Sequence, residues 1–298
     1  MYIQAIAALL EENGVKMTAY AFISGATGGL GKAFAVECAS RGWNLFLTDT
    51  NANRLKTLTE GIQRTYGVQV AAHACDLSDY QARTALFARL GEMQAAFHML
   101  INVAGVDYEG LFQSRSRDEI RAIVRVNIES TLDVTHAVLE RTCPGQPLHI
   151  ITVSSLAAFY PMPVKATYAA SKRFLLDFFL ALRDEIKEYG STVTILCPAG
   201  MPTTPVSIEG IEAQGLMGHL TTSDVGKVAA KTIDSALRGK AVVIPGFLNQ
   251  VLQFLGGLLP PVSIASLVGN RWRSARKKRP SQQTKPELTT QYSSQAPG

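Results

Sequence analysis

The sequence has few of the residues that build metal centres and disulfide frameworks. Its 298 residues contain four cysteines and five histidines, and none of these are grouped at the short spacings that ligate a metal. We therefore expect no metal site. Cys38, Cys75, Cys143 and Cys197 are scattered, and three of them fall in apolar stretches. This usage is typical of reduced thiols in a cytoplasmic protein.

Charge is nearly balanced over most of the chain. Residues 271–298 hold seven Lys or Arg and one acidic residue, which leaves 22 basic against 23 acidic residues elsewhere. A near-neutral body implies no basic surface for nucleic acid, so no nucleic-acid partner is expected. No Asp, Glu, Lys or Arg occurs between Ala241 and Asn270.

This uncharged stretch is long enough to cross a bilayer, but a glycine pair at Gly256 and a proline pair at Pro260 interrupt it. These pairs argue against one continuous spanning helix. One hypothesis is a broken apolar element that contacts a membrane surface through residues 247–279, with the basic stretch on anionic lipid. The alternative is that the element caps a substrate cleft or packs against a second subunit.

Four segments follow from these changes of composition. Residues 18–246 have the length of one α/β domain. Residues 1–17 precede it as an amphipathic extension, without the basic lead-in of a secretory signal. Residues 247–270 are the apolar segment, and residues 271–298 are a basic stretch followed by a tail whose composition is typical of disorder.

Apolar strand-like runs alternate with helical patterns along the body. The seven runs lie near Phe22, Leu45, Val70, Leu100, Ile151, Val193 and Val243. The alternation predicts an α/β fold with a doubly wound, Rossmann-like parallel sheet and helices on both faces. The expected strand order is 3-2-1-4-5-6-7, with a ligand at the carboxyl ends of the strands where the order reverses.

A glycine-rich turn, SGATGGLG, follows the first apolar run and opens a helical pattern. Gly25 permits a tight turn, Gly29 lets the backbone approach a pyrophosphate, and Gly31 allows the helix to pack closely on the strand. The helix N-terminus offers unpaired N–H groups to the phosphates. The context of strand, loop and helix predicts a dinucleotide site. The other loop residues assigned to this site are Thr27, Gly28 and Leu30.

Asp49 ends the second strand, eighteen residues beyond Gly31. Its position suits an acceptor for the adenosine ribose hydroxyls. A carboxylate there would repel a 2′-phosphate, so we predict NAD as the cofactor, with NADP less favoured. The competing interpretation is a turn or capping aspartate ahead of the next helix. Lys32 and Arg54 are near enough in sequence to weaken the charge argument.

Ser155, Tyr168 and Lys172 form a pattern suited to proton transfer. Tyr168 and Lys172 are four residues apart in a helical stretch, so both project from one face. Ser155 lies thirteen residues before Tyr168, at the end of an apolar strand. A nearby cation favours the phenolate, so we expect Lys172 and the cationic ring of a bound cofactor together to lower the pKa of Tyr168 and make it a usable acid or base. Lys172 alone, partly solvated, is expected to fall short. The alternative is an exposed aromatic beside a solvated lysine.

With these motifs placed, the chain resembles the short-chain dehydrogenase/reductase family, in its shorter single-domain branch, from about Thr18 to about Ile244. SGATGGLG resembles the TGxxxGxG loop, with Ser24 where threonine is usual. INVAG resembles the NNAG motif, with Val103 in place of the second asparagine. CPAGMPTT resembles the PGxVxT segment, with Ala199 in the glycine position.

The resemblance implies a role for each residue of the set. Asn127 completes the catalytic group and would hold a water that links Lys172 to solvent. Ser155 would hydrogen-bond the substrate oxygen, Tyr168 would exchange a proton with it, and Lys172 would also hold the nicotinamide ribose. The further cofactor contacts that it implies are Asp76, Leu77, Asn102, Ala104, Gly105, Pro198 and Thr203.

The resulting hypothesis is an oxidoreductase that transfers a hydride between a nicotinamide cofactor and a hydrophobic secondary alcohol or ketone. Residues 200–222 are long and glycine-bearing, and we expect them to form the substrate lid. Two alternatives stay open. A sugar-nucleotide epimerase-type enzyme is one, because Gly28 makes the loop fit GxxGxxG as well; a non-catalytic dinucleotide-binding scaffold is the other. A homodimer or homotetramer in the cytoplasm is expected, with membrane association as an open question.

Overall fold

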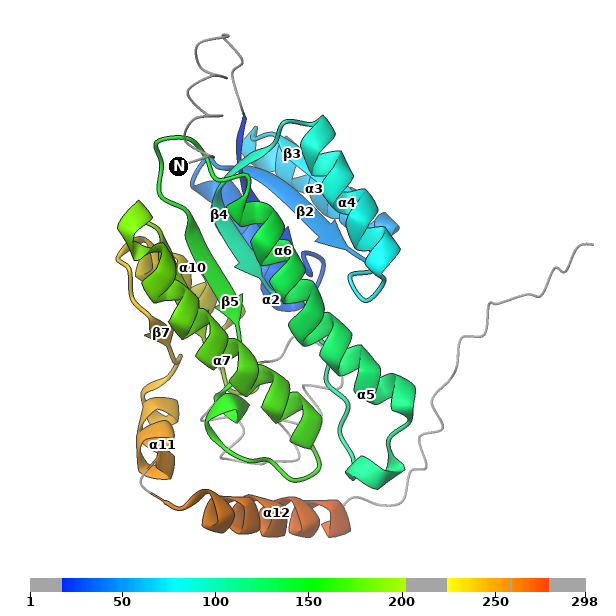
Figure 1. Ribbon diagram of the computed structural model, residues 1–298, viewed down its shortest axis with the longest axis vertical. Helices are drawn as coiled ribbons and strands as arrows, with labels where there is room; N and C mark the ends of the chain where they lie inside the picture. Colours follow the sequence, from blue (N-terminus) through cyan, green and yellow to red (C-terminus); the bar gives the residue numbers. More distant parts are fainter. Residues whose placement is uncertain (1–17, 202–223, 258, 279–298) are drawn as a thin grey trace, which may run out of the picture.

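Seven parallel strands form the centre of the molecule (Figure 1). The structure is a computed structural model that describes residues 18–201, 224–257 and 259–278. The strand order is β3-β2-β1-β4-β5-β6-β7, as predicted. The strands are β1 Ala19–Ser24, β2 Asn44–Asp49, β3 Val70–Ala74, β4 Ala96–Asn102, β5 His149–Val153, β6 Thr192–Leu196 and β7 Val242–Val243.

Helices cover both faces of the sheet, as the sequence pattern indicated. One face packs against α2 (Gly29–Ser40), α3 (Ala52–Tyr66) and α10 (Val225–Leu237). The other face packs against α4 (Tyr80–Glu92), α6 (Ser130–Leu139) and α7 (Ala166–Ile186), which lie toward the viewer in Figure 1. The remaining elements before β7 are α5 (Arg117–Ile123), the π-helical turn η2 (Val124–Glu129) and the short 3-10 turns η1 (Phe112–Ser114), η3 (Leu156–Phe159) and η4 (Lys187–Tyr189).

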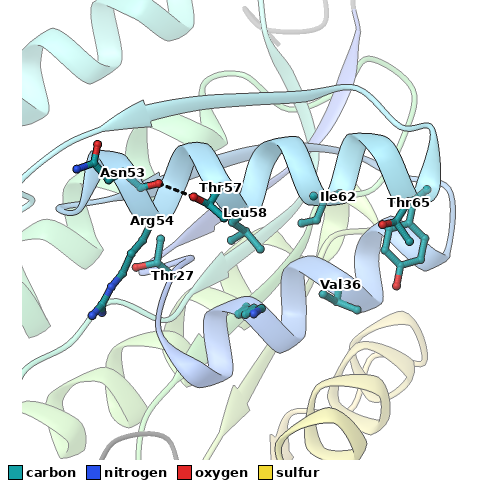
Figure 2. A pocket seen from close by; sticks show the side chains of 11 residues that line it. Thr27, Val36, Asn53, Arg54, Thr57, Leu58, Ile62 and Thr65 are labelled. Atoms are coloured by element: carbon teal, nitrogen blue, oxygen red, sulfur yellow. Dashed lines mark hydrogen bonds between the residues drawn. The ribbon is translucent and has the colours of Figure 1, made fainter.

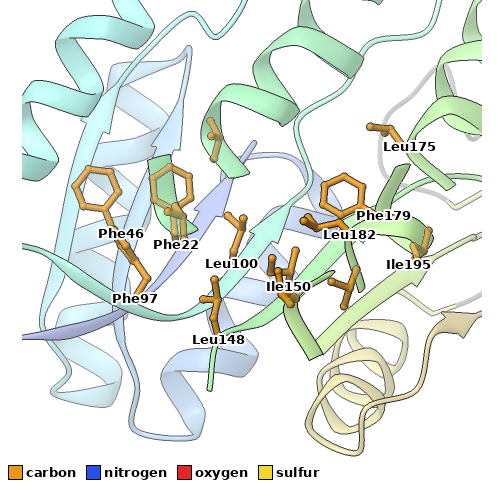
Figure 3. Packing of buried hydrophobic residues seen from close by; sticks show 14 of the residues in the cluster. Phe22, Phe46, Phe97, Leu100, Leu148, Ile150, Leu175, Phe179, Leu182 and Ile195 are labelled. Atoms are coloured by element: carbon orange, nitrogen blue, oxygen red, sulfur yellow. The ribbon is translucent and has the colours of Figure 1, made fainter. Parts of the chain in front are cut away.

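The strands are apolar on both sides because both faces of the sheet are covered. In β1, Phe22 faces the layer of α4, α6 and α7, and Ile23 faces the layer of α2, α3 and α10; both are fully buried. Figure 3 shows Phe22 and Phe46 beside Phe97 on the side of α4, α6 and α7. The rings of Phe22 and Phe46 are stacked with centroids 5.3 Å apart, and Phe97 meets Phe22 edge-on at 5.6 Å. Because helices cover both faces of the sheet, the site residues lie at the edge formed by the ends of these strands.

Two helices follow β7 and lie beyond the carboxyl ends of the strands (Figure 1). They are α11 (Phe247–Gly257) and α12 (Pro261–Lys278). The apolar segment is therefore broken next to its proline pair, where a proline cannot continue the preceding helix. The Tyr160 hydroxyl, just after η3, donates to the Leu252 carbonyl oxygen of α11 at 2.7 Å. None of the helices described combines the length and apolarity that a bilayer crossing requires.

Candidate active site

The glycine-rich loop joins β1 to α2 and is shaped by close backbone contacts. Gly25 has a φ of +64°, and a Cβ there would lie 2.8 Å from the Ala104 backbone nitrogen. At Gly31 a Cβ would overlap the Gly25 carbonyl oxygen. The Ser24 hydroxyl accepts from the backbone N–H groups of Val103 and Ala104 at 3.2 and 3.3 Å. The end of β1 is thereby tied to the loop that follows β4.

The first turn of α2 is open to a ligand. Gly28 is the N-cap residue of α2, and no side chain caps this helix end. A Cβ at Gly28 would meet only the Gly25 carbonyl oxygen, at an ordinary contact distance of 3.5 Å. Gly28 and Gly29 are both exposed. An uncapped helix N-terminus with an accessible backbone fits a phosphate-bearing cofactor.

Asp49 holds the glycine-rich loop from the end of β2. Its Oδ2 accepts from the Thr27 backbone N–H at 2.9 Å, and its Oδ1 accepts from the Asn51 N–H at 3.3 Å. The N-cap of α3 is Asn51, whose side chain accepts from Arg54 N–H at 2.9 Å. Asp49 is therefore not the cap of that helix, and its carboxylate lies beside the loop where an adenosine ribose is expected.

A groove of about 550 Å³ runs between α2 and α3 and begins at Thr27. Lys32 and Arg54 both line it, and Figure 2 shows the Arg54 side chain beside Thr27. Two cations therefore share this part of the site with Asp49. The sequence placed Lys32 and Arg54 near the loop, and the structure adds that both lie on the same groove.

The loops after β3 and β4 contain the next group of predicted cofactor contacts. Asp76 is exposed, and its Oδ1 accepts from Ser78 N–H at 2.9 Å. Leu77 is buried, and its carbonyl oxygen accepts from the buried Arg83 at 2.8 Å. Asn102 is buried at the end of β4, where its Nδ2 donates to the Thr135 hydroxyl at 3.0 Å. Leu77 and Asn102 thus anchor the loops on which their exposed neighbours lie.

Ser155, Tyr168 and Lys172 meet at the carboxyl end of β5. Ser155 is near enough to Tyr168 to lower the pKa of the phenol, and its hydroxyl accepts from Ala157 N–H at 3.1 Å. Lys172 Nζ lies 5.8 Å from the centroid of the Tyr168 ring and donates to the Val153 carbonyl oxygen at 2.9 Å. The four-residue spacing therefore does bring the phenol and the ammonium into one site.

Asn127 lies in the π-helical turn η2 and is fully buried behind this site. Its Oδ1 accepts from Val106 N–H at 2.8 Å, and its Nδ2 donates to the Val106 carbonyl oxygen and the Ser171 hydroxyl, each at 3.0 Å. A Cβ at Gly105 would lie 3.2 Å from both Asn127 Oδ1 and Lys172 Nζ. A side chain in place of Gly105 would therefore press on both groups and require them to shift by a few tenths of an ångström.

Burial dominates the protonation of the two titrating groups. It raises the pKa of Tyr168 to about 12, with a further rise from Asp107 and a lowering from the Ser155 hydrogen bond. Burial also lowers the pKa of Lys172 to about 8, against a rise caused by Asp107. Lys172 alone therefore does not bring the pKa of Tyr168 below its ordinary value, because loss of water outweighs the neighbouring charge. The lowering expected from a bound cationic cofactor ring stays a prediction.

Asp107 and Lys165 are site residues that the sequence analysis missed. Lys165 Nζ pairs with Asp107 Oδ2 at 2.5 Å and Glu109 Oε2 at 3.7 Å. The same ammonium lies 5.7 Å from the centroid of the Tyr168 ring. Their closeness in sequence to predicted site residues could have identified them, since Asp107 lies two residues after Gly105 and Lys165 lies three residues before Tyr168.

The remaining predictions concern the segment after β6, the cysteines and a metal site. Pro198 is buried after β6, and its carbonyl oxygen accepts from Leu156 N–H at 2.8 Å. Thr203 and residues 202–222 of the expected lid lie outside the described residues.

All four cysteines are buried thiols. Within the described ranges, no group of three or more His, Cys, Asp or Glu side chains could hold a metal ion.

A Rossmann-like sheet with a glycine-rich loop and a Ser, Tyr and Lys group at its carboxyl edge defines a class of nicotinamide-dependent oxidoreductases. The family model described as "short chain dehydrogenase" matches residues 19–214. The chain therefore belongs to the short-chain dehydrogenase/reductase family, as the sequence motifs indicated.

Individual relatives agree with this membership. The chain is 34% identical over 188 residues to the very-long-chain 3-oxoacyl-CoA reductase of Laccaria bicolor, covering 62% of this chain and 55% of that protein. It is 33% identical over 187 residues to the inactive hydroxysteroid dehydrogenase-like protein 1 of Homo sapiens, covering 62% and 56%. The chain thus spans little more than half the length of these relatives.

A solved structure of similar fold is the short-chain dehydrogenase from Sphingobium yanoikuyae in complex with NADPH. It is 25% identical, with a TM-score of 0.68, and the match covers 89% of this chain and 97% of that one.

Proposed function

We propose that the protein is an NAD(P)-dependent oxidoreductase that interconverts a hydrophobic secondary alcohol and its ketone, with Tyr168 as the acid or base. The observation that carries this proposal is the meeting of Ser155, Tyr168 and Lys172 at the end of β5, at the same sheet edge as the open N-terminus of α2. A nicotinamide cofactor bound along this edge would supply or accept the hydride.

The residues divide the proton chemistry between them. Tyr168 donates its proton to the carbonyl oxygen during reduction and takes the hydroxyl proton during oxidation. Ser155, which lies beside Tyr168 and lowers its pKa, holds the same substrate oxygen and stabilises the charge that develops on it. Lys172 is held by Val153 and faces the Tyr168 ring. Its ammonium stabilises the phenolate once Tyr168 has given up its proton.

The direction of the pKa shifts favours reduction near neutral pH. With a pKa of about 12, Tyr168 is protonated and ready to donate. Oxidation requires the phenolate, so its rate should rise with pH until the tyrosine has titrated. A positive charge bound near Tyr168 would lower its pKa and bring this rise to lower pH.

For the cofactor we propose a preference for NAD, with Asp49 as the acceptor for the adenosine ribose. The position of the Asp49 carboxylate beside Thr27 supports this preference, while Lys32 and Arg54 on the adjoining groove act against it. Fluorescence titration with NADH and NADPH tests the balance. We expect NADH to bind more tightly, and Asp49→Asn to narrow the difference by about ten-fold. Tighter binding of NADPH to the unaltered protein would contradict the preference.

The test of the catalytic proposal is a screen of alcohols and ketones with both cofactors, run beside Tyr168→Phe. We expect this change to lower turnover by about 10²- to 10⁴-fold, because it removes the proton donor. Tyr189→Phe, at a tyrosine that is 66% exposed on η4, is the control and should keep full activity. Turnover that survives in Tyr168→Phe would remove the phenol from the mechanism.

A non-catalytic dinucleotide-binding protein is the second candidate, and the name of the human relative favours it. The same screen separates the two functions. Cofactor binding without turnover of any alcohol or ketone would support the binding protein. Tyr168-dependent turnover would support the enzyme, for which Asn127, Ser155, Tyr168 and Lys172 are all present.

A further inference from the structure

The two C-terminal helices expose a dense group of apolar side chains. Fifteen large apolar side chains are exposed among the described residues, and six of them lie within 21 consecutive positions. These six are Phe247, Phe254, Leu255, Leu259, Val262 and Leu267. Phe247 is 82% exposed and Val262 79%. Covering such a side chain gains about 1.5–3 kcal/mol, so a group of this density marks an interaction surface.

Five of the six exposed side chains lie on helices that are attached to the body, and Leu259 lies between the two helices. Asn249 of α11 is 1% exposed, and its Nδ2 donates to the Pro245 carbonyl oxygen at 2.7 Å. Leu252 of α11 accepts the Tyr160 hydroxyl, and Ile264 of α12 is only 7% exposed. Phe247 and Phe254 are two helical turns apart and thus share the outward face of α11. The apolar surface is therefore presented while other residues of the same helices pack inward.

The charge of this part of the chain selects an anionic partner. Residues 247–278 contain no acidic residue, and the last eight residues of α12 include five basic ones in their sequence. Apolar helices that end in a basic stretch are typical of elements that lie in the interface of an anionic membrane. Each basic residue near such a surface contributes about 1 kcal/mol. A second copy of this chain offers less attraction, because the rest of the chain has only one more acidic than basic residue.

We propose that α11 and α12 form a docking surface for an anionic lipid membrane. The apolar side chains enter the boundary between headgroups and acyl chains, and the basic stretch from residue 271 lies on the lipid phosphates. Figure 1 shows both helices at the end of the molecule toward which the strands run, and α11 contacts η3 next to Ser155. Docking would bring the site to the lipid surface. The proposal goes beyond the oxidoreductase function and does not depend on it, because lipid binding needs no turnover.

Flotation with lipid vesicles tests the proposal. Vesicles of phosphatidylcholine alone are compared with vesicles that also contain phosphatidylserine. We expect the protein to float with the anionic vesicles, to bind neutral ones more weakly, and to be released by salt. The double variant Val262→Asp, Leu267→Asp should bind the anionic vesicles about ten-fold less or weaker still. Tyr189→Asp, Leu237→Asp is the matched control, since both residues are exposed outside α11 and α12, and it should bind like the unaltered protein.

Circular dichroism and urea unfolding establish that each variant is folded. Failure of the unaltered protein to float with anionic vesicles would overturn the proposal, and so would equal loss of binding in the control pair. Sedimentation without lipid tests the alternative that a second copy of this chain covers the surface. If the Val262→Asp, Leu267→Asp protein has a smaller oligomeric mass while the unaltered protein ignores vesicles, the surface joins two copies of this chain and the lipid proposal is wrong.

Discussion

For the single residues of the site, burial decides the charge state. Lys172 is 4% exposed, and its ammonium is held by one backbone carbonyl. Holding an ammonium in such a place costs free energy, because the charged form loses its hydration. The lowered pKa of Lys172 is thus also a statement about stability.

We expect the cost of burying the ammonium to appear as a pH-dependent difference in the free energy of unfolding between Lys172→Met and the unaltered protein. The pKa of Lys172 falls from 10.5 to about 8 on folding, so between these values the unfolded chain binds more protons and stability rises with pH. Any advantage of Lys172→Met in the free energy of unfolding is therefore fully present below pH 8. It should shrink by roughly 3 kcal/mol as the pH rises to about 10.5. Urea unfolding at several pH values measures the difference.

Lys187→Met is the control for this series, since the Lys187 side chain is 60% exposed in its ion pair with Asp184. Its difference from the unaltered protein should vary little over the same pH range. A constant difference for Lys172→Met as well would show that the ammonium is hydrated in the folded protein.

The sequence predicted which residues meet at the site but not their environment. Helical spacing alone places Tyr168 and Lys172 on one face, and the end of a strand places Ser155 at the sheet edge. The surroundings of Lys172 include Gly105 and Asn127, which approach from distant parts of the chain. The charge of Asp107 also reaches Tyr168 through space. No local pattern contains these contacts, so the direction of the Tyr168 shift could not be predicted.

At the scale of elements, the strands were predictable because both faces of the sheet are covered. Each strand is then a short apolar run between turn residues, and β1 to β7 correspond to the seven runs of the sequence. The π-helical turn at η2 was not predictable, since one wider turn within a helical stretch leaves no periodic pattern. Asn127 was therefore located by its motif, while the turn that positions it was found only in the structure.

In the unit of β1, loop and α2, Gly31 serves close packing and Gly28 serves access for the cofactor. Variants of the two glycines should therefore differ in their effects on stability and on cofactor binding. Gly31→Ala would force a Cβ onto the Gly25 carbonyl oxygen. We expect it to lower the free energy of unfolding by about 2 kcal/mol or more. Gly28→Ala meets only an ordinary contact at 3.5 Å, so stability should change by less than about 1 kcal/mol. It should nevertheless weaken cofactor binding, because it adds a methyl group next to Gly29, where a pyrophosphate is expected to approach the backbone.

Urea unfolding and NADH titration of the two proteins measure both effects. Unchanged NADH affinity in a folded Gly28→Ala protein would contradict the placement of the pyrophosphate at this turn.

On the scale of the whole molecule, the four cysteines report on the integrity of both helical layers. Cys38 packs on one face of the sheet, and Cys75 and Cys197 pack on the other. Burial raises the pKa of Cys75 to about 11 and that of Cys197 to about 12. The thiolate is the reactive form, so these thiols are protected both by lack of access and by protonation.

Thiol labelling should therefore follow global unfolding and slow when a cofactor binds. We expect slow labelling of the native protein by a thiol reagent and a steep increase in rate with urea, because all four cysteines are buried. NADH at 100 times its dissociation constant stabilises the folded state by about 2.7 kcal/mol, so labelling through global opening should slow about 100-fold. Cys143→Ser is the control for local access, since Cys143 at 6% is the most exposed of the four. If NADH leaves the rate unchanged in this variant as well, the thiols react through local openings remote from the cofactor and not through global unfolding.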